Sequence, residues 1–554
     1  MKRSIKIISA AIALVFFALC LTGCGAGSTD AVIMPLEGDA LDFDDSNGVS
    51  VHDPSVFKAQ DGTYYITGSH IASAKSSDLI HWSTISAGVY DSNRTLVNEG
   101  STLRESYEKA FAWCDGAQRL WEKSEDEWET NVWASDIIYN PAMGKYCYYA
   151  SSSVWGTTAS VIWMAVSDSP EGTFEFADTM IYSGFSSRTT LFGRPKNQLH
   201  YSFTNIGELI ENGTFTKDEV ESKDWFDEDG NYDCTYGKYP NAIDPAPFYD
   251  ENGELWLAYG SYSGGIYVMP LVEETGMPDY GAMRETDGYD IYFGKQISCT
   301  NEESGGTGEG PFIVYDAESG YYYLFLSYGG LGALDGYNIR EYRSESPDGP
   351  YYDTAGNCAT DMKNTGTKII GNYRFSFNNT DILSPGHSSC LIDDDGRIYQ
   401  VYHQRYNDGE GAFHNVQVHQ MLRTADGWLT MLPLPYGGET ASEVSDSDIS
   451  GAYEVIFFSD DTKTAADWSN IKNAVEPILS ASIDNNSKIT VGGTEGQITL
   501  NNDAHTFTLA LDGEHFSGVF CEAELDGRTV MTISAVSDKN RTLWAVENQN
   551  ANSI

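Results

Sequence analysis

Paired cysteine motifs and positive charge are both scarce in this chain of 554 residues. The nine cysteines are widely spaced, and none forms the CxxC pattern of zinc or redox sites, so we expect buried or unpaired structural thiols. Lys and Arg number only 33 against 81 Asp and Glu, which gives a net charge of −48. Such an acidic chain repels phosphate polymers, so we expect no nucleic-acid partner, whereas a neutral glycan is compatible with this surface.

Long apolar runs are absent beyond the N-terminus, where residues 7–21 form a run too short to span a membrane comfortably. Lys2 and Arg3 precede this run, and Leu21-Thr22-Gly23-Cys24, which follows it, resembles a bacterial lipoprotein cleavage box. We therefore predict a signal peptide over residues 1–23, a lipid on Cys24 and an acidic tether over 24–48. The protein would then sit on the extracellular face of a bacterial membrane, held only by its lipid anchor. An ordinary signal peptide with a chance cysteine is the alternative.

One pattern is repeated five times along the chain. A polar residue opens a short apolar strand, a Gly turn follows, and an aromatic strand returns. The openings are Asp53, Asp136, Asp244, Glu309 and His387. Repeats of this size predict the blades of an all-β, five-bladed β-propeller over residues 49–440, whose innermost strands line a central axis. The five opening residues should therefore meet at that axis.

The pattern changes after residue 440. Strand-like runs at 488–491, 498–500 and 507–511 alternate with turns. They predict a separate small β-barrel or sandwich over residues 441–554, which is within the usual size of a domain.

Four carboxylates and a histidine at one axis would be costly as structure alone, because like charges repel and lose their hydration. Function usually explains such a cluster. Glycoside hydrolysis needs two carboxyl groups flanking the bond, and one of them, the general acid, needs a raised pKa. Asp53, Asp244 and Glu309 supply that set. Asp136, His52 and His403 are expected to be structural.

The segments at 52–55, 241–245, 308–311 and 384–387 resemble the signature segments of glycoside hydrolase family 43 arabinanases. The resemblance spans about residues 50 to 440, and residues 418–421 and 426–428 fit the two-domain extracellular endo-arabinanases. It implies inverting endo-hydrolysis of α-1,5-linked arabinan, a pectin side chain. Asp53 would be the general base and Glu309 the general acid, while Asp244 would orient Glu309 and raise its pKa. Inversion implies that the Asp53 and Glu309 carboxyls lie about 6.5–9.5 Å apart.

The resemblance also implies a calcium ion near His387, held largely through water. It further implies a set of substrate contacts. They are Asp53, Gly156, Asn241, Ala242, Ile243, Asp244, Ser261, Tyr262, Ser263 and Glu309.

Three alternatives remain open. An exo-acting arabinofuranosidase or β-xylosidase could use the same scaffold, because insertions at about 102–130 and 207–239 decide between an open groove and a pocket. A non-catalytic, glycan-binding surface lipoprotein would be expected to lack one of the three carboxylates, and all three are present. An unrelated propeller acting as an interaction scaffold would not need the carboxylates at all.

Overall fold

The structure is a computed structural model that describes most of the chain beyond residue 47. The described residues are 48–87, 113, 132–153, 157–189, 199–234, 238–299, 308–332, 336–361, 365–406, 414–459, 475–501 and 505–548. The predicted signal peptide, Cys24, Gly156 and almost all of the 102–130 insertion lie outside these residues. Within them, no helix combines the length and apolar character that a membrane crossing requires.

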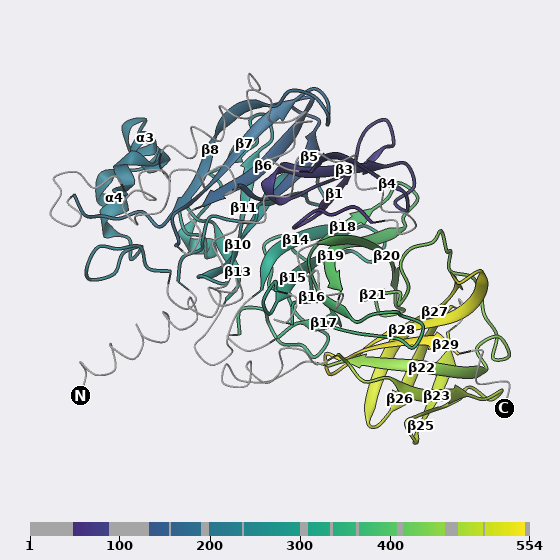
Figure 1. Ribbon diagram of the computed structural model, residues 1–554. Coiled ribbons are helices and arrows are strands. Elements are labelled where there is room, and N and C mark those ends of the chain that lie inside the picture. Colours follow the sequence, from purple (N-terminus) through teal and green to yellow (C-terminus); the bar gives the residue numbers. More distant parts are fainter. Residues whose placement is uncertain are drawn as a thin grey trace, which may run out of the picture.

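Five antiparallel sheets follow one another along the chain and surround one axis, as the repeat predicts (Figure 1). Four of them have four strands in sequential order, and the third has five. The first sheet holds β1 (Ser55–Lys58), β2 (Tyr64–Thr67), β3 (Ala72–Ser76) and β4 (Trp82–Ala87); the second holds β5 (Val132–Asn140), β6 (Lys145–Ser153), β7 (Ser160–Ser167) and β8 (Glu175–Ser183). The third holds β9 (Ala246–Tyr249), β10 (Leu255–Ser261), β11 (Gly265–Val272), β12 (Met277–Pro278) and β13 (Lys295–Ser298). The fourth holds β14 (Glu309–Asp316), β15 (Tyr321–Tyr328), β16 (Asn338–Ser344) and β17 (Thr367–Ile370); the fifth holds β18 (Ile382–Ile392), β19 (Ile398–Tyr406), β20 (Asn415–Arg423) and β21 (Leu429–Met431).

The C-terminal strands close into an eight-stranded barrel, so the prediction of a barrel or sandwich resolves to a barrel. Its interior is packed with buried apolar side chains such as Phe507, Phe516 and Phe520. The strands are β22 (Gly451–Phe458), β23 (Leu479–Ile483), β24 (Lys488–Val491), β25 (Thr494–Leu500), β26 (Thr506–Leu511), β27 (Glu514–Leu525), β28 (Arg528–Ser537) and β29 (Thr542–Glu547).

Short helices lie in the connections between strands. The 207–239 insertion contributes α3 (Asn205–Glu211) and α4 (Lys217–Ser222), which lie at the end of the molecule away from the barrel (Figure 1). A capping box between Thr216 and Glu219 defines the start of α4. Among the described residues there are also three single 3-10 turns: η1 (Ser69–Ile71), η3 (Tyr201–Phe203) and η4 (Glu285–Asp287).

The register of the repeat differs from the sequence prediction in two blades. Pairing with the second strand is regular from Ser55, Asp136, Ala246, Phe312 and Ser389 onward. Asp136 therefore aligns with Ser55 rather than with Asp53, and Gly310, not Glu309, aligns with Asp53. β-bulges lie just before Asp136, Phe312 and Ser389, in the second, fourth and fifth blades; His387 of the fifth blade keeps its predicted place, and only the second and fourth openings are shifted. Each bulge inserts an extra residue that sequence spacing does not reveal.

The barrel packs on the fourth and fifth blades through the outside of its wall. Trp544 of β29 is fully buried against Phe458 of the barrel and against Tyr373 and His419 of the propeller. Trp544, Phe458 and Tyr373 belong to one apolar cluster shared by both domains. The contact therefore resembles a continuous core rather than a mobile hinge.

Asn540, in the β28–β29 turn, joins the two domains by hydrogen bonds. Its side-chain nitrogen donates to Asp353 at 2.7 Å, and its oxygen accepts from the Thr354 hydroxyl at 2.9 Å and the Ala355 amide at 3.0 Å. The residue is 3% exposed and has a left-handed φ of 60°. Asn is among the few residues that adopt this conformation readily, so it suits both the turn and the contact.

Candidate active site

A ring of five left-handed residues surrounds the propeller axis, one at the start of the inner strand of each blade. Their φ angles lie between 41° and 58°. Four of them donate their backbone amide to a side chain of the preceding blade, at 2.7 to 3.1 Å. The ring consists of Asp53, Ala134, Asp244, Gly310 and His387; the acceptors are Ser69 for Ala134, Asp244 for Gly310, Ser327 for His387 and His403 for Asp53. These bonds fix the position of four of the five blades relative to the preceding one.

The ring residues and the two residues after each of them line a small axial cavity of about 20 Å³. That volume is enough for about one water molecule or a single ion. Asp136 lies on this cavity and accepts a hydrogen bond from Ser55 at 2.5 Å. Burial raises the pKa of Asp136 to about 7.

Asp53 lies among histidines and is only 7% exposed. One carboxylate oxygen is 3.0 Å from His387 Nδ1 and 3.2 Å from His52 Nε2, and the other accepts from the Ser69 hydroxyl. Burial alone would raise the pKa of Asp53, but the charge interactions with His387 and His52 outweigh it and hold that pKa well below its usual range. Asp53 is therefore ionised over the whole neutral range, as a general base requires.

Glu309 has the opposite electrostatic character. Burial and the neighbouring Asp244 carboxylate raise the pKa of Glu309 to about 8. The Tyr337 hydroxyl donates to one of its oxygens at 2.7 Å, and the Ser261 hydroxyl donates to the other at 3.3 Å. Burial also raises the pKa of Asp244, to about 6. The site thus holds one carboxylate ready to accept a proton and one carboxylic acid ready to donate one.

The other predicted substrate contacts of the third blade lie just before Asp244 in the chain or at the end of β10. Ser261 contacts Glu309 directly, and the Tyr262 hydroxyl donates to the Gly329 carbonyl at 2.6 Å. The segment before Asp244 is anchored by Ala242, which is fully buried. The Ala242 amide donates to the Ser183 hydroxyl, and the Ser160 hydroxyl donates to the Ala242 carbonyl. Asn241 and Ile243 are half-buried, as is Ser263, whose carbonyl accepts from the Asn241 amide at 3.2 Å.

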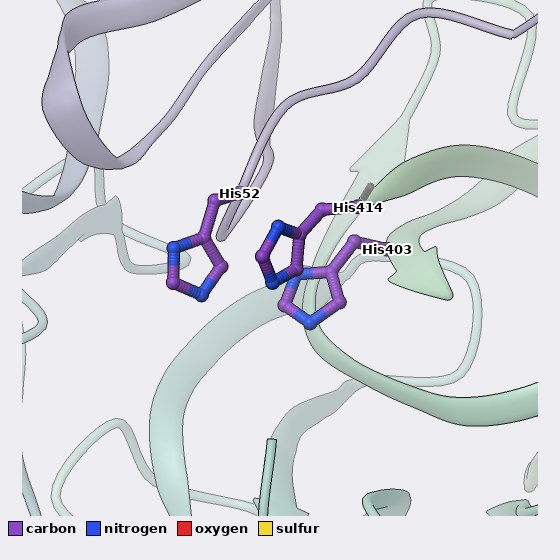
Figure 2. A group of neighbouring side chains, drawn as sticks. All are labelled: His52, His403 and His414. Atoms are coloured by element: carbon purple, nitrogen blue, oxygen red, sulfur yellow. The ribbon is translucent and has the colours of Figure 1, made fainter. Parts of the chain in front are cut away.

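Three histidines cluster behind Asp53, and their ring nitrogens approach within 4.8 Å of one another. Figure 2 shows the His414 ring between those of His52 and His403. His403 Nδ1 already accepts from the Asp53 amide, and His414 Nε2 lies 2.7 Å from the Arg405 guanidinium. These lone pairs are engaged and a permanent cation lies beside them, so the cluster is poorly suited to a metal ion. Its role is to support Asp53.

Sequence reasoning did not identify Ser69 and Tyr337, which donate hydrogen bonds to Asp53 and Glu309, and it assigned His403 only a structural role. These three residues are not at repeat openings. Ser69 lies just beyond the end of β2, and His403 lies within β19, three residues before its end; both accept the backbone amide of a ring residue. Serines occupy similar places in other blades, at Ser261 and Ser327, and that recurrence is the signal that could have identified them.

Comparisons with known proteins agree with this geometry. The profile of the glycosyl hydrolases family 43 matches residues 212–429, and that of a C-terminal lipocalin-like domain matches residues 433–545. The chain is 33% identical over 515 residues to the extracellular endo-alpha-(1->5)-L-arabinanase 2 of Bacillus subtilis, covering 90% of this chain and 92% of that protein. It is 32% identical over 421 residues to the extracellular endo-alpha-(1->5)-L-arabinanase of Thermotoga petrophila, covering 73% of this chain and 75% of that protein.

Solved structures give the same result for both domains together. The endo-1,5-alpha-L-arabinanase of Thermotoga petrophila superposes with a TM-score of 0.71 at 30% identity, covering 91% of this chain and 99% of that one. The family 43 glycoside hydrolase YxiA of Bacillus licheniformis has the same TM-score at 32% identity, with the same coverage. A propeller with paired carboxylates at its axis, a C-terminal barrel and relatives over nine-tenths of the chain lead to one assignment: this chain belongs to glycoside hydrolase family 43.

Proposed function

We propose that this protein is an extracellular endo-α-1,5-arabinanase that cuts arabinan with inversion at the anomeric carbon. Relatives named as extracellular endo-arabinanases cover most of the chain. The observation that carries the chemistry is the opposite shift of two axial carboxyl pKa values: that of Asp53 is lowered and that of Glu309 is raised. Paired carboxyls with such opposed protonation are what glycoside hydrolysis requires.

In this mechanism Asp53 removes a proton from a water molecule, which attacks the anomeric carbon from the face opposite the leaving group. Glu309 donates its proton to the departing O5 of the next arabinose unit. Asp244 does not contact the scissile bond; its charge keeps the Glu309 proton in place and its carboxylate holds the Gly310 amide at 3.1 Å. Burial lowers the pKa of His387, but the Asp53 charge 3.0 Å away raises it to about 9, so His387 carries the positive charge that offsets the buried charge of Asp53 and keeps that carboxylate ionised.

The axial cavity fits the calcium ion that the family resemblance implies. Oxygen atoms of Asp136 and Ser55 line it, and the buried Ser388 hydroxyl has no hydrogen-bond partner among the described residues. Calcium prefers oxygen ligands and retains water readily. His387 would face the ion with Nε2 and hold it largely through water, because its Nδ1 faces Asp53. The ion would supply positive charge at the axis. Calorimetric titration of chelator-treated protein with Ca²⁺ should give one binding event, which Ser388→Ala weakens; no binding heat would contradict this site.

The lipid anchor on Cys24 is also part of the proposal, and it rests on the sequence alone. Replacing Cys24 with Ser should release active enzyme from the cell surface into the medium. The wild-type protein should stay on the cell surface and incorporate radioactive palmitate. Equal release of both forms would contradict the anchor.

Hydrolysis of linear, debranched arabinan tests the function, with wild type and Glu309→Gln compared and products separated by size. We expect mixed oligosaccharides from wild type and a loss of about a thousandfold in the variant, since a general acid contributes about 10²–10⁴. Arabinose as the sole product would indicate an exo-acting enzyme. A folded but inactive wild type would contradict the proposal.

A further inference from the structure

Between the two proposed catalytic carboxyls lies a pair of rings that the reaction scheme does not use. His403 accepts the backbone amide of Asp53 at 3.1 Å through Nδ1. The ring of Tyr337 stacks on His403, with centroids 5.9 Å apart and planes at 21°. The Tyr337 hydroxyl donates to Glu309 at 2.7 Å. An unbroken path of contacts therefore runs from the base to the acid.

Both rings are held on all sides. Tyr337 is 1% exposed and His403 is 0% exposed. Gly386 pairs with His403 across the two strands and lies directly against the Tyr337 ring, where a Cβ would come within 1.9 Å of Tyr337 Cδ1. His414 packs edge-on against His403, with centroids 4.8 Å apart (Figure 2). Neither ring can rotate without moving its neighbours, because packed interiors transmit displacement.

The polar atoms of these rings serve no evident packing purpose. An apolar pair could fill the same space without burying a hydroxyl and an imidazole, both of which cost free energy unless they are hydrogen-bonded. Each ring instead directs one polar atom to a carboxyl-bearing residue of the site. The path also crosses three blades, since Glu309 and Tyr337 belong to the fourth, His403 to the fifth and Asp53 to the first.

Single displacement requires the two carboxyls at a separation that leaves room for one water, and errors of about 1 Å can cost about a hundredfold in rate. Asp53 and Glu309 belong to different blades, so their separation depends on the contacts that join those blades. We propose that Tyr337 and His403 form a positioning bridge that fixes the acid Glu309 relative to the base Asp53. This inference rests on the proposed function of the same site. The hydroxyl of Tyr337 also favours the ionised form of Glu309, so it opposes the effect of Asp244 on that pKa.

Three variants separate the parts of the bridge. Tyr337→Phe keeps the ring and removes only the hydrogen bond to Glu309. His403→Leu removes the acceptor for the Asp53 amide, whereas His403→Asn keeps an acceptor close to the position of Nδ1. Tyr328→Phe is the matched control, because it deletes a buried hydroxyl of the same blade that bonds to Tyr342 at 2.6 Å, away from the carboxyls. The readouts are kcat and KM on debranched arabinan across pH, and the rate on a 2,4-dinitrophenyl arabinotrioside, whose leaving group needs no acid.

For Tyr337→Phe we expect kcat on arabinan to fall about tenfold with KM within about twofold, and the basic limb to move up by about one pH unit. Its rate on the dinitrophenyl substrate should stay within about twofold of wild type. His403→Asn should retain at least about tenfold more activity than His403→Leu, and Tyr328→Phe should keep the wild-type profile.

Three results overturn the bridge while wild type is active: an unmoved basic limb in Tyr337→Phe, equal losses on both substrates, or no advantage of Asn over Leu at position 403. Wild type that is folded but inactive on both substrates instead overturns the proposed arabinanase, and the bridge with it.

Discussion

Removing the charge of Asp244 should move the basic limb of the activity profile to lower pH. Asp244→Asn is a conservative change at this position. Asn adopts the left-handed φ of 56° readily, and its side-chain oxygen can still accept the Gly310 amide. The substitution therefore removes a negative charge beside Glu309 and leaves the backbone ring intact.

The size of the shift follows from the causes of the raised pKa. Glu309 moves from 4.5 to about 8, with burial as the larger cause and Asp244 as the next. Burial remains in the variant, so we assign to Asp244 about one pH unit, or about 1.4 kcal/mol. A limb that falls from about 8 to about 7 lowers the protonated fraction of Glu309 at pH 8 about fivefold, and at pH 7 about twofold.

The assay is kcat/KM on debranched arabinan between pH 4 and 10, for wild type, Asp244→Asn and Asp250→Asn. Asp250 is a buried carboxylate of the same blade that bonds to backbone amides of its hairpin, so its variant should keep the wild-type limb. A basic limb of Asp244→Asn that stays in place or moves to higher pH would refute the electrostatic role of Asp244.

Three further predictions concern the ring and the domain contact. Asp53→Asn should lower the rate of arabinan hydrolysis about a thousandfold. It should also lower the pKa of His387 in an NMR titration of the imidazole, because burial lowers that pKa and Asp53 raises it to about 9. An unmoved His387 pKa would contradict the ion pair. Gly310→Ala should lower kcat about tenfold, because the φ of Gly310 is 58° and a Cβ there would lie 3.1 Å from the His387 ring. Gly320→Ala lies in an open hairpin turn and should retain the wild-type kcat. Equal effects of the two substitutions would contradict the steric argument. Asn540→Gly should lower the free energy of unfolding by about 3 kcal/mol in urea titration, because its hydrogen bonds with Asp353, Thr354, Ala355 and Thr367 are lost. The exposed turn variant Asp512→Gly should change that free energy by less than about 0.5 kcal/mol, and a neutral Asn540→Gly would contradict the bond between the domains.

Much of the architecture was predictable because each repeat is marked by residue types at neighbouring positions in the sequence. Hairpin turns with Gly and aromatic returning strands mark each blade, and the family segments mark Asp53, Asp244 and Glu309. The register of the axis was not predictable, because a bulge adds a residue without changing the composition of its strand. Asp136 was therefore placed beside Asp53, although it lies in the layer of Ser55.

The supporting residues were harder to find for a different reason. His403 lies 350 residues from Asp53 in sequence, and only the closure of the propeller brings them together. Tyr337 follows a loop rather than a repeat opening, so nothing local distinguishes it from the many tyrosines that pack between blades. His52 and His403 were expected to be structural, yet the chain alone gives no sign that they face a carboxylate.

The stereochemistry of the first product tests the central claim most directly. Proton NMR of debranched arabinan in the first minutes after adding concentrated wild-type enzyme resolves the anomeric signals of the new reducing ends. With Asp53 activating water and Glu309 protonating the leaving oxygen, the β-anomer should form first and the α-anomer should grow in only by mutarotation. Initial formation of the α-anomer would mean a covalent intermediate, and would contradict Asp53 as the base and Glu309 as the acid of a single displacement.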